Sequence, residues 1–229
     1  MSVRYYSELI QGSNKWKEAR LGIITASQTG KLVTPKTRKI ADNDDSRGIV
    51  YEKLAERITG RNDDFFQSKY MDLGNVFEPF ARDLYSAKKA KVIEMGFIVK
   101  DFNGFKIGYS PDGLVEEDYA GEGRGLIEIK CPSRNVHIKG ICTGEIPAMY
   151  TMQMQTGMLV TGREWCDYVS YFNGMKLNII RMYADKSLHD LIIEAVKVIE
   201  KRVVECADDY EVKTKNMPMA KFIESEYNE

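Results

Sequence analysis

Three charged residues, Asp112, Glu128 and Lys130, lie in or beside segments whose composition otherwise predicts β-strands. Glu128 and Lys130 are two positions apart in the apolar run 125–131, and successive side chains of a strand alternate between its faces. The two charges therefore share one face, while Ile129 between them points to the other. Asp112 ends the preceding strand, and in an antiparallel pair it can face Glu128 across the ladder.

Two carboxylates on adjacent strands form an oxygen site of the kind that binds Mg²⁺ or Mn²⁺. The backbone carbonyl of Ile129 offers a further ligand, and we expect two Mg²⁺ ions with Mn²⁺ as a substitute. A lysine beside such ions can orient or deprotonate a water molecule, more easily where the cations depress its pKa. Asp112, Glu128 and Lys130 thus form a minimal set for metal-assisted phosphodiester hydrolysis. A surface salt bridge made by Glu128 is the simpler alternative for this pattern taken alone.

Two expected helices can each bring one more side chain to this site. Gly74 and Glu78 are four residues apart and hence on one helical face, where Gly74 leaves room for close approach. Gln153 and Gln155 are two residues apart, so they diverge on a helix and at most one of them points into the site. We favour Gln153, and we expect Glu78 to be a third carboxylate.

The segment from Trp16 to Ser27 predicts an anion pocket. It combines Arg20, small residues and a helix N-terminus near Ser27, which are features that bind phosphate groups. Trp16 is a candidate aromatic contact for the terminal base pair of a duplex, although packing is the more frequent role of such a residue.

The remaining pattern predicts an α+β fold, in which a mixed β-sheet is flanked by helices. Strand-like runs at 91–99, 105–110 and 125–131 indicate an antiparallel meander. Pro79 should kink or split the helix expected from Lys69 to Ala90, because proline removes a hydrogen-bond donor. We expect residues 1–229 to form a single nuclease domain, with a helical N-terminal segment (residues 1–90), a catalytic sheet with helices in 91–184, and a helix 187–207 followed by a tail.

Composition limits the range of functions. The net charge is −1, so binding to DNA requires a local basic surface. Four cysteines without a C-x-x-C pair and only two histidines argue against a zinc cage and indicate reduced thiols. A nucleophilic Cys131–His137 pair lacks an orienting third group. No apolar stretch predicts a membrane span and no signal peptide is evident, so we expect a cytoplasmic protein, in the host cytoplasm if the gene belongs to a phage.

Taken together, these segments resemble the lambda-type phage exonuclease family, the nucleases of viral recombination systems. The resemblance covers about residues 14 to 160 and follows the order of the family's motifs. The matching residues are Trp16-x3-Arg20-x-Gly22-x-Ile24-Thr25-Ala26-Ser27, Gly74-x3-Glu78, Ser110-Pro111-Asp112-Gly113, Glu128-x-Lys130-Cys131-Pro132 and Tyr150-x2-Gln153-x-Gln155.

The resemblance implies a restriction-endonuclease-like PD-(D/E)xK core. It further implies a Mg²⁺-dependent exonuclease that degrades one strand of double-stranded DNA 5′→3′ from its ends, leaving a 3′ overhang for a single-strand annealing protein. Family members form ring-shaped homotrimers. By position, Asp112 and Glu128 would ligate metal, Lys130 would serve the water, and Glu78 and Gln153 would complete the site.

The same resemblance assigns the 5′-terminal phosphate to Arg20, Ser27 and Ser110. It also implies a basic DNA contact from the polar loop near residues 34–47, for which we choose Arg38 among four candidates, Lys36, Arg38, Lys39 and Arg47. Two alternatives remain open: an endonuclease or junction resolvase with the same core, and a non-catalytic scaffold that binds DNA ends. The intact Asp112, Glu128 and Lys130 argue against the scaffold.

Overall fold

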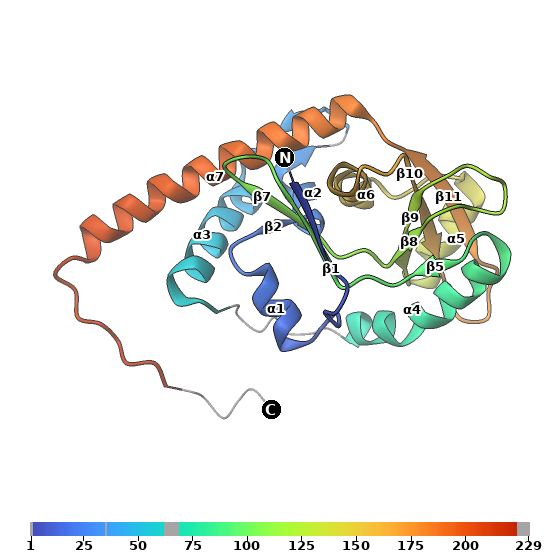
Figure 1. Cartoon of the computed structure of the whole chain (residues 1–229), viewed down its shortest axis with the longest axis horizontal. Helices are drawn as coiled ribbons and strands as arrows, with labels where there is room; N and C mark the ends of the chain where they lie inside the picture. Colours follow the sequence, from blue (N-terminus) through green and yellow to red (C-terminus); the bar gives the residue numbers. More distant parts are fainter. Residues whose placement is uncertain (1, 35, 62–68, 224–229) are drawn as a thin grey trace.

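The computed structural model describes residues 2–34, 36–61 and 69–223, and within helix α4 it describes no side chains for residues 69–73 and 75. Two β-sheets lie on either side of a central helix, and further helices surround them (Figure 1). The first sheet has the strand order β1 (Ser2–Tyr6), β6 (Phe97–Asp101), β7 (Lys106–Tyr109) and β2 (Ile24–Thr25).

The second sheet is the mixed sheet that the sequence predicts. Its order is β11 (Asn178–Tyr183), β10 (Trp165–Ser170), β9 (Gly125–Lys130), β8 (Gly113–Val115) and β5 (Val92–Ile93). Strands β9 and β10 are parallel and the other pairs are antiparallel. A separate two-stranded ribbon pairs β3 (Val33–Thr34) with β4 (Lys39–Ile40). The expected α+β fold with a mixed sheet is therefore confirmed.

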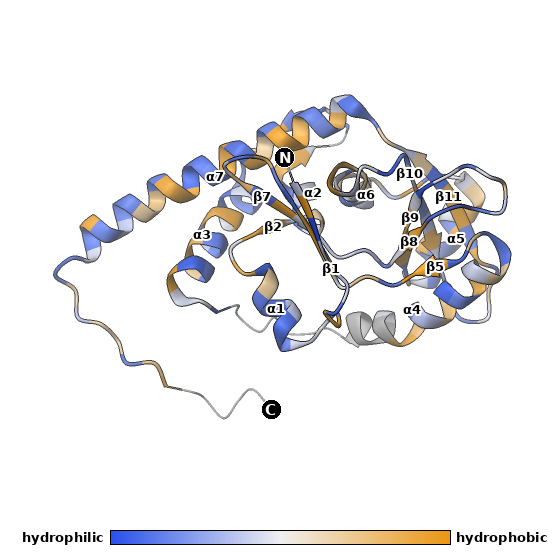
Figure 2. Ribbon diagram, viewed as in Figure 1, coloured by the Kyte–Doolittle hydropathy of each residue, from blue (hydrophilic) through white to orange (hydrophobic). Residues whose placement is uncertain are grey.

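The helices fill the space between and around the sheets. Helix α6 (Ala148–Thr161) contacts strands of both sheets, and α4 (Lys69–Lys88) packs on the outer face of the second sheet (Figure 1). Apolar residues from Leu188 to Val203 form the buried stripe of α7 (Lys186–Thr214), whose polar and apolar residues alternate along its length (Figure 2). The other helical segments are α1 (Asn14–Arg20), the 3₁₀ turn η1 (Ala26–Gln28), α2 (Thr29–Leu32), α3 (Asp44–Thr59) and α5 (Arg134–Thr143).

Two expectations about the elements need correction, and a third is narrowed. Residues 1–90 are not only helical, because β1 and β2 form both edges of the first sheet. Their pairing partners come from residues 97–109, and a local pattern carries no information about such distant partners. The C-terminal helix is longer than expected and runs to Thr214. Pro79 lies inside α4, which continues through it, so of the two expected outcomes, a kink or a split, the split does not occur.

The expected meander is divided between the two sheets. The run 91–99 breaks at Gly96, where an added Cβ atom would lie 2.1 Å from the backbone oxygen of Leu9. As a result β5 joins the second sheet and β6 the first. After β6 and β7, the chain returns from the first sheet to the second through Ser110–Pro111–Asp112, which connect β7 to β8. The crossing therefore places Asp112 where the two sheets meet.

None of the helices in the described residues is long and apolar enough to span a membrane. All four cysteines are free thiols, as expected. His137 is fully buried, and its ring nitrogens are 2.7 Å from Ser170 Oγ and 3.1 Å from the carbonyl oxygen of Lys176. This histidine is therefore engaged by other groups rather than by Cys131.

Candidate active site

Strand β9 has one apolar face and one charged face, as the alternation of its side chains predicts. Ile127 and Ile129 belong to a buried cluster with Tyr85 of α4. Glu128 and Lys130 extend from the opposite face, where Gln153 of α6 donates a hydrogen bond to Glu128. Helix packing on one face of β9 thus leaves the other face for the charged pair.

Asp112 faces Glu128 across the hairpin of β8 and β9. The register pairs Gly113 with Ile127, so one further step places Asp112 opposite Glu128. The Asp112 carboxylate accepts a hydrogen bond from the amide of Ile129, with 2.6 Å between Oδ2 and N. Within a strand, the N–H and C=O groups of one residue point to the same edge, so the Ile129 carbonyl also points to the Asp112 side. The three predicted oxygen ligands therefore come from neighbouring positions of two paired segments, the start of β8 and the end of β9.

Glu128 is the most deeply buried acid of the site, with no exposed surface. Its Oε1 atom accepts hydrogen bonds from Lys130 and, at 2.6 Å, from Gln153 Nε2. Its Oε2 atom is buried and has no hydrogen-bond partner among the described residues. Burial raises the pKa of the Glu128 carboxyl group to about 7, against the opposing effect of Lys130. An unpartnered buried carboxylate oxygen is costly unless a cation or proton joins it.

Lys130 is held in its charged form in this arrangement. Burial favours the neutral amine, but the charges of Glu128 and Asp112 outweigh that effect and raise the pKa of Lys130 above its usual value. The ammonium group is also 5.3 Å from the centroid of the Tyr150 ring, a distance typical of a cation–π contact. Without metal, Lys130 is therefore suited to donating hydrogen bonds rather than to removing a proton.

Glu78 lies beside Asp112, as the sequence predicts. Burial, followed by the charge of Asp112, raises the pKa of the Glu78 carboxyl group to about 7. Its Oε1 atom is paired with Arg82, whose Nε donates to the backbone carbonyl of Asp112 at 2.9 Å. Among the described residues, no atom lies within 4 Å of a Cβ atom added to Gly74, so the close approach expected there is not observed in that part of the chain.

Arg82 is a site residue that our sequence reasoning missed. It lies four residues after Glu78 on the same helix, a spacing that favours an ion pair and could have indicated it. It is 13% exposed and its third contact is Glu94, at 3.1 Å. Arg82 therefore links α4, the start of β8 and the segment between β5 and β6.

The two glutamines of α6 point in different directions. Gln153 reaches Glu128, whereas Gln155 is 2% exposed and binds the chain after β11. The Gln155 amide donates to the carbonyl of Tyr183 and accepts from the amide of Asp185, each at 2.9 Å. The choice of Gln153 as the glutamine that enters the site thus agrees with the structure.

Arg20 and Trp16 meet Ser110 at the other end of the site. The Ser110 hydroxyl accepts hydrogen bonds from Arg20 at 2.8 Å and from the indole N–H of Trp16 at 3.0 Å. The Arg20 guanidinium stacks 4.0 Å from the centroid of the Trp16 ring. Burial lowers the pKa of Arg20 to about 10, against the opposing charge of Glu56, and no carboxylate among the described residues forms an ion pair with it. A half-buried cation without a direct ion pair is suited to a phosphate group.

Ser27 is exposed at the same end, with its hydroxyl 3.2 Å from that of Thr25. The predicted capping box of Thr25 and Gln28 is present, and the 3₁₀ turn η1 that it begins continues directly into α2, which ends at Leu32. The helical segment expected there is therefore present but short, and side chains would have to supply most of the binding of an anion.

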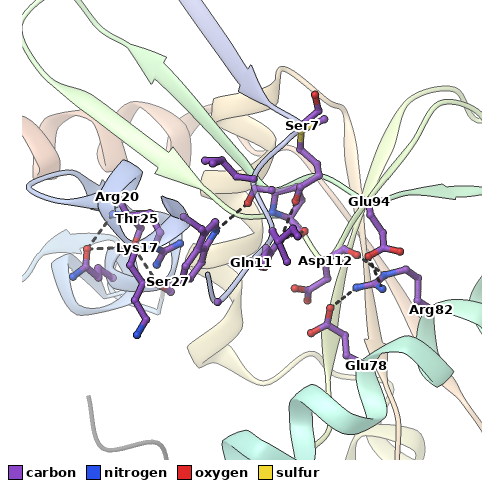
Figure 3. Close-up of a pocket in the computed structure, with 18 of the residues that line it drawn as sticks. Ser7, Gln11, Lys17, Arg20, Thr25, Ser27, Glu78, Arg82, Glu94 and Asp112 are labelled. Atoms are coloured by element: carbon purple, nitrogen blue, oxygen red, sulfur yellow. Dashed lines mark hydrogen bonds and ion pairs between the residues drawn. The ribbon is translucent and has the colours of Figure 1, made fainter. Parts of the chain in front are cut away.

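One cleft of about 1150 Å³ joins the two ends. Arg20 and Ser27 line one side of it and Glu78 and Asp112 the other, with Gln11 between them (Figure 3). Arg20 and Ser27, predicted to bind phosphate, therefore face the same space as Glu78 and Asp112, predicted for the metal site.

Further charged residues line the cleft near Arg20. Lys17, Lys31 and Lys53 add three cations there. Glu52 and Glu56 also line that end, and both are paired with Lys53, at 3.0 Å and 2.9 Å. Among the described lining residues, cations thus outnumber carboxylates at the Arg20 end, whereas carboxylates outnumber cations at the Asp112 end. We call these the basic and the acidic end of the cleft.

Arg38 does not belong to this cleft, so its expected role as a DNA contact gains no support from the structure. It lies at the β3–β4 turn and forms an ion pair with Asp185 at 2.8 Å, next to Ser187 at the start of α7. Arg47, another candidate, binds Asp42 and Asp44. The physical reason is that an acidic partner far away in the chain, Asp185, holds the Arg38 side chain away from the cleft.

The site fits a hard divalent cation with few protein ligands. Within the described residues, no three His, Cys, Asp or Glu side chains form a ready-made metal cage. Mg²⁺ rarely uses such cages, and commonly binds through one or two carboxylates together with water and substrate phosphate. Asp112, the Ile129 carbonyl and the unpartnered Oε2 of Glu128 match that donor set.

The topology and the arrangement of Asp112, Glu128 and Lys130 define a nuclease core of the restriction-endonuclease type. Within that class, the chain belongs to the family described as the YqaJ-like viral recombinase domain, whose model matches residues 15–164. This membership agrees with the resemblance to lambda-type phage exonucleases and covers every catalytic residue that the sequence predicts.

Solved structures support the same fold. The chain is 30% identical to the alkaline exonuclease LHK-Exo from Laribacter hongkongensis, with a TM-score of 0.76 over 90% of this chain and 100% of that one. A complex of LHK-Exo with dAMP gives the same TM-score and coverage at 31% identity. A phage-related exonuclease from Haemophilus somnus shares the fold at 17% identity, with a TM-score of 0.58 over 82% and 96% of the two chains.

A curated relative, the protein R354 of Acanthamoeba polyphaga mimivirus, is 32% identical over 118 residues. That match covers 48% of this chain but only 21% of the mimivirus protein. The matched region therefore corresponds to about a fifth of the length of that relative.

Proposed function

We propose that this protein is a Mg²⁺-dependent 5′→3′ exonuclease that degrades one strand of linear double-stranded DNA from its ends. The product would carry a 3′ single-stranded overhang for an annealing protein. The observation that carries the proposal is one cleft lined by Arg20 at one end and by Asp112 at the other. Arg20 has no ion pair among the described residues, and Asp112 lies opposite the buried Glu128 on the neighbouring strand. The alkaline exonuclease fold, and the dAMP bound by a relative with that fold, support it.

The basic end of the cleft would bind the 5′-terminal phosphate. Arg20 supplies a charge and Ser110 a hydroxyl, and Ser27 lies exposed beside them. Charge-assisted hydrogen bonds to phosphate are among the stronger ones in proteins. Trp16 holds the Arg20 guanidinium through its ring face and also binds Ser110. Together these contacts would fix the end of one strand and set which phosphodiester bond reaches the acidic end.

The acidic end would hold the metal through Asp112, Glu128 and the Ile129 carbonyl. Bound Mg²⁺ would supply an activated water molecule and neutralise charge on the phosphate. Lys130, held as an ammonium ion, would orient the water and donate to developing negative charge. Gln153 fixes the Glu128 carboxylate by a hydrogen bond to one of its oxygens, which leaves the other oxygen available.

Glu78 would complete this end of the cleft beside Asp112. Arg82 pairs with Glu78 and therefore fixes its carboxylate in the absence of metal. When a cation binds nearby, the charge on Glu78 is favoured, because the positive field opposes protonation. We assign Glu78 a place in the acidic site and Arg82 the role of holding it.

Digestion of linear duplexes tests the proposal. With Mg²⁺, a linear duplex carrying 5′-phosphates should be degraded from each 5′ end, while a covalently closed circle stays intact. EDTA should abolish the reaction, and Mn²⁺ should restore it. Cutting of the closed circle would instead favour the endonuclease or resolvase alternative. Binding of ends without any cleavage would favour the scaffold.

We also propose a ring-shaped homotrimer around the duplex, and an annealing protein as a partner for the 3′ overhang. Both rest on the family resemblance. A net charge of −1 leaves DNA affinity to few phosphate contacts, so an enclosing ring would help to retain the substrate. Mass photometry of the protein alone should show a species of three chains, and a monomer throughout the concentration range would contradict it.

A further inference from the structure

The segment Ser7–Ser13, here named the N-terminal strap, connects β1 to α1 and lies along the cleft. Its residues Leu9, Ile10, Gln11 and Gly12 line the cleft between the Arg20 end and the Asp112 end (Figure 3). The strap precedes residues 15–164, which the family model matches. Nothing in the sequence motifs therefore assigns it a role.

Gln11 of the strap is bound to two distant segments of the backbone. Its Nε2 atom donates to the carbonyl of Met95 at 2.9 Å and to the carbonyl of Pro111 at 2.8 Å. A glutamine amide has two N–H donors, so both are used. An exposed glutamine would ordinarily exchange its partners with water, whereas Gln11 joins segments that are 84 and 100 residues away from it.

The strap itself has little freedom to move away. An added Cβ atom on Gly96 would lie 2.1 Å from the Leu9 carbonyl oxygen, so the two backbones are in direct contact there. Just after the strap, Trp16 donates to the carbonyl of Gly96 at 3.1 Å. The backbone on either side of Gln11 is therefore itself fixed by contacts with Gly96.

The segment that Gln11 holds links the two ends of the cleft. Ser110 accepts from Arg20 and Trp16, Pro111 accepts from Gln11, and the Asp112 carbonyl accepts from Arg82. Two residues span at most about 7 Å of extended backbone. The distance between the phosphate-binding hydroxyl and the metal-binding carboxylate therefore depends on how this tripeptide is held.

We propose that Gln11 is a positioning residue that fixes Ser110–Pro111–Asp112, and with it the distance from the bound DNA end to the cleavage site. Arg82 is its counterpart, since each side chain ties this tripeptide to the segment of Glu94 and Met95. The inference rests on the proposed function. It predicts that Gln11 affects both the affinity of the site for metal and the position at which the DNA strand is cut.

The test replaces Gln11 with methionine, which has a similar length and no N–H donor. Hydrogen bonds that orient metal ligands from behind typically change metal affinity by about 10–100-fold. Isothermal titration of the DNA-free protein with Mn²⁺ should therefore show affinity weakened within that range. On a 5′-phosphorylated, end-labelled duplex, the wild type should release single nucleotides, and Gln11→Met a mixture of one- and two-nucleotide products.

The matched control is Glu8→Met in the same strap. Glu8 is exposed and does not line the cleft, so this variant should keep wild-type Mn²⁺ affinity and product length. Gln11→Asn keeps the amide on a shorter side chain and should give an intermediate effect. It also serves as the test variant if Gln11→Met does not fold.

Two results would overturn the inference. One is wild-type Mn²⁺ affinity and single-nucleotide products in Gln11→Met, with only a lower unfolding temperature. The other is an equal loss in Glu8→Met. Failure of the proposed function is distinguishable, because the wild type itself would then leave linear duplexes intact, while the Mn²⁺ titration still reports on Gln11.

Discussion

The key side chains at the two ends of the cleft differ in the contacts that they make and in those that they lack. At the acidic end, Glu128 is fully buried and linked to Lys130 and Gln153, yet keeps one oxygen without a partner among the described residues. At the basic end, Arg20 is stacked and hydrogen-bonded but lacks a counterion in the same described ranges. The acidic end therefore offers a carboxylate oxygen without a hydrogen-bond partner, and the basic end a guanidinium group without an ion pair, so the two ends suit partners of opposite charge.

This difference matches the two partners that the cleft would receive. A cation at the acidic end and a phosphate at the basic end would each relieve a local cost of burying charge. The acidic end is built on the paired strands β8 and β9, whereas the basic end depends on side-chain contacts between α1 and Ser110. We therefore expect substitutions at the acidic end to abolish the reaction and those at the basic end to change which DNA ends are used.

The largest effect should come from Asp112→Asn. The amide oxygen of asparagine can still accept from the Ile129 N–H, so the fold should persist while the metal loses a charged ligand. Because metal catalysis supplies several kcal/mol, kcat should fall on the order of 10³-fold. Release of acid-soluble nucleotides from a linear duplex measures this, with circular dichroism as the control for folding. Activity within about tenfold of the wild type would remove Asp112 from the metal site.

Arg20→Met should have the next largest effect, and it should depend on the DNA end. A hydrogen bond to a charged group contributes about 1.5–3 kcal/mol, so cleavage of 5′-phosphorylated ends should slow about 10–100-fold. Ends with a 5′-hydroxyl should be cut at the wild-type rate. The measurement compares kcat/KM on two duplexes that differ only in the end group.

Arg38→Met is the matched control for Arg20. Arg38 is 54% exposed, paired with Asp185 and outside the cleft, so both end types should be cut as by the wild type. Exposed ion pairs contribute about 0–1 kcal/mol, so stability should change little. Equal slowing in both arginine variants would indicate a general electrostatic effect rather than a phosphate pocket.

The sequence could predict the positions of those residues that depend only on local patterns. Alternation along 125–131 and the turn at Asp112 are local, and they placed Glu128, Lys130 and Asp112 together correctly. The same is true of the divergence of Gln153 from Gln155, which follows from helical geometry. Residues whose positions follow from the period of one element were thus predictable.

Positions that depend on distant partners were not. Arg38 is held by Asp185, which is 147 residues away, and Gln11 binds Pro111 across 100 residues. The division of 91–99 between two sheets depends on the contact of Gly96 with Leu9. A pattern within one segment contains no information about these partners, so the loop at 34–47 and the strap could not be placed.

The two glutamines of α6 allow a sharper comparison within the acidic end. Gln153→Ala should lower kcat about 10–100-fold with little change in the unfolding temperature, because it removes a bond that orients Glu128. Gln155→Ala should do the opposite, since it leaves two backbone groups near β11 unpaired. That loss should cost about 1–3 kcal/mol of stability. Thermal unfolding and steady-state kinetics on both variants measure the difference, and similar profiles would contradict it.

The smallest effect concerns the pH dependence of metal binding at the acidic end. Burial raises the pKa values of Glu78 and Glu128 to about 7, so both are largely protonated in the metal-free protein below that pH. A metal must displace these protons, so Mn²⁺ affinity should rise by up to about tenfold per group from roughly pH 6 to roughly pH 8. Lys130 stays protonated throughout, because its pKa is raised.

The stability of the metal-free protein should change in the opposite direction. The folded pKa values lie above the ordinary value of about 4.3, so the folded state holds more protons than the unfolded state in this range. The free energy of unfolding should therefore fall as pH rises through about 7, and Mn²⁺ should restore it more at the higher pH. Titration calorimetry and thermal unfolding at both pH values measure the two trends. In Glu78→Gln, the pH dependence of Mn²⁺ affinity and that of the free energy of unfolding should both be smaller. Equal Mn²⁺ affinity of the wild type at the two pH values would show that neither carboxyl group loses a proton when the metal binds.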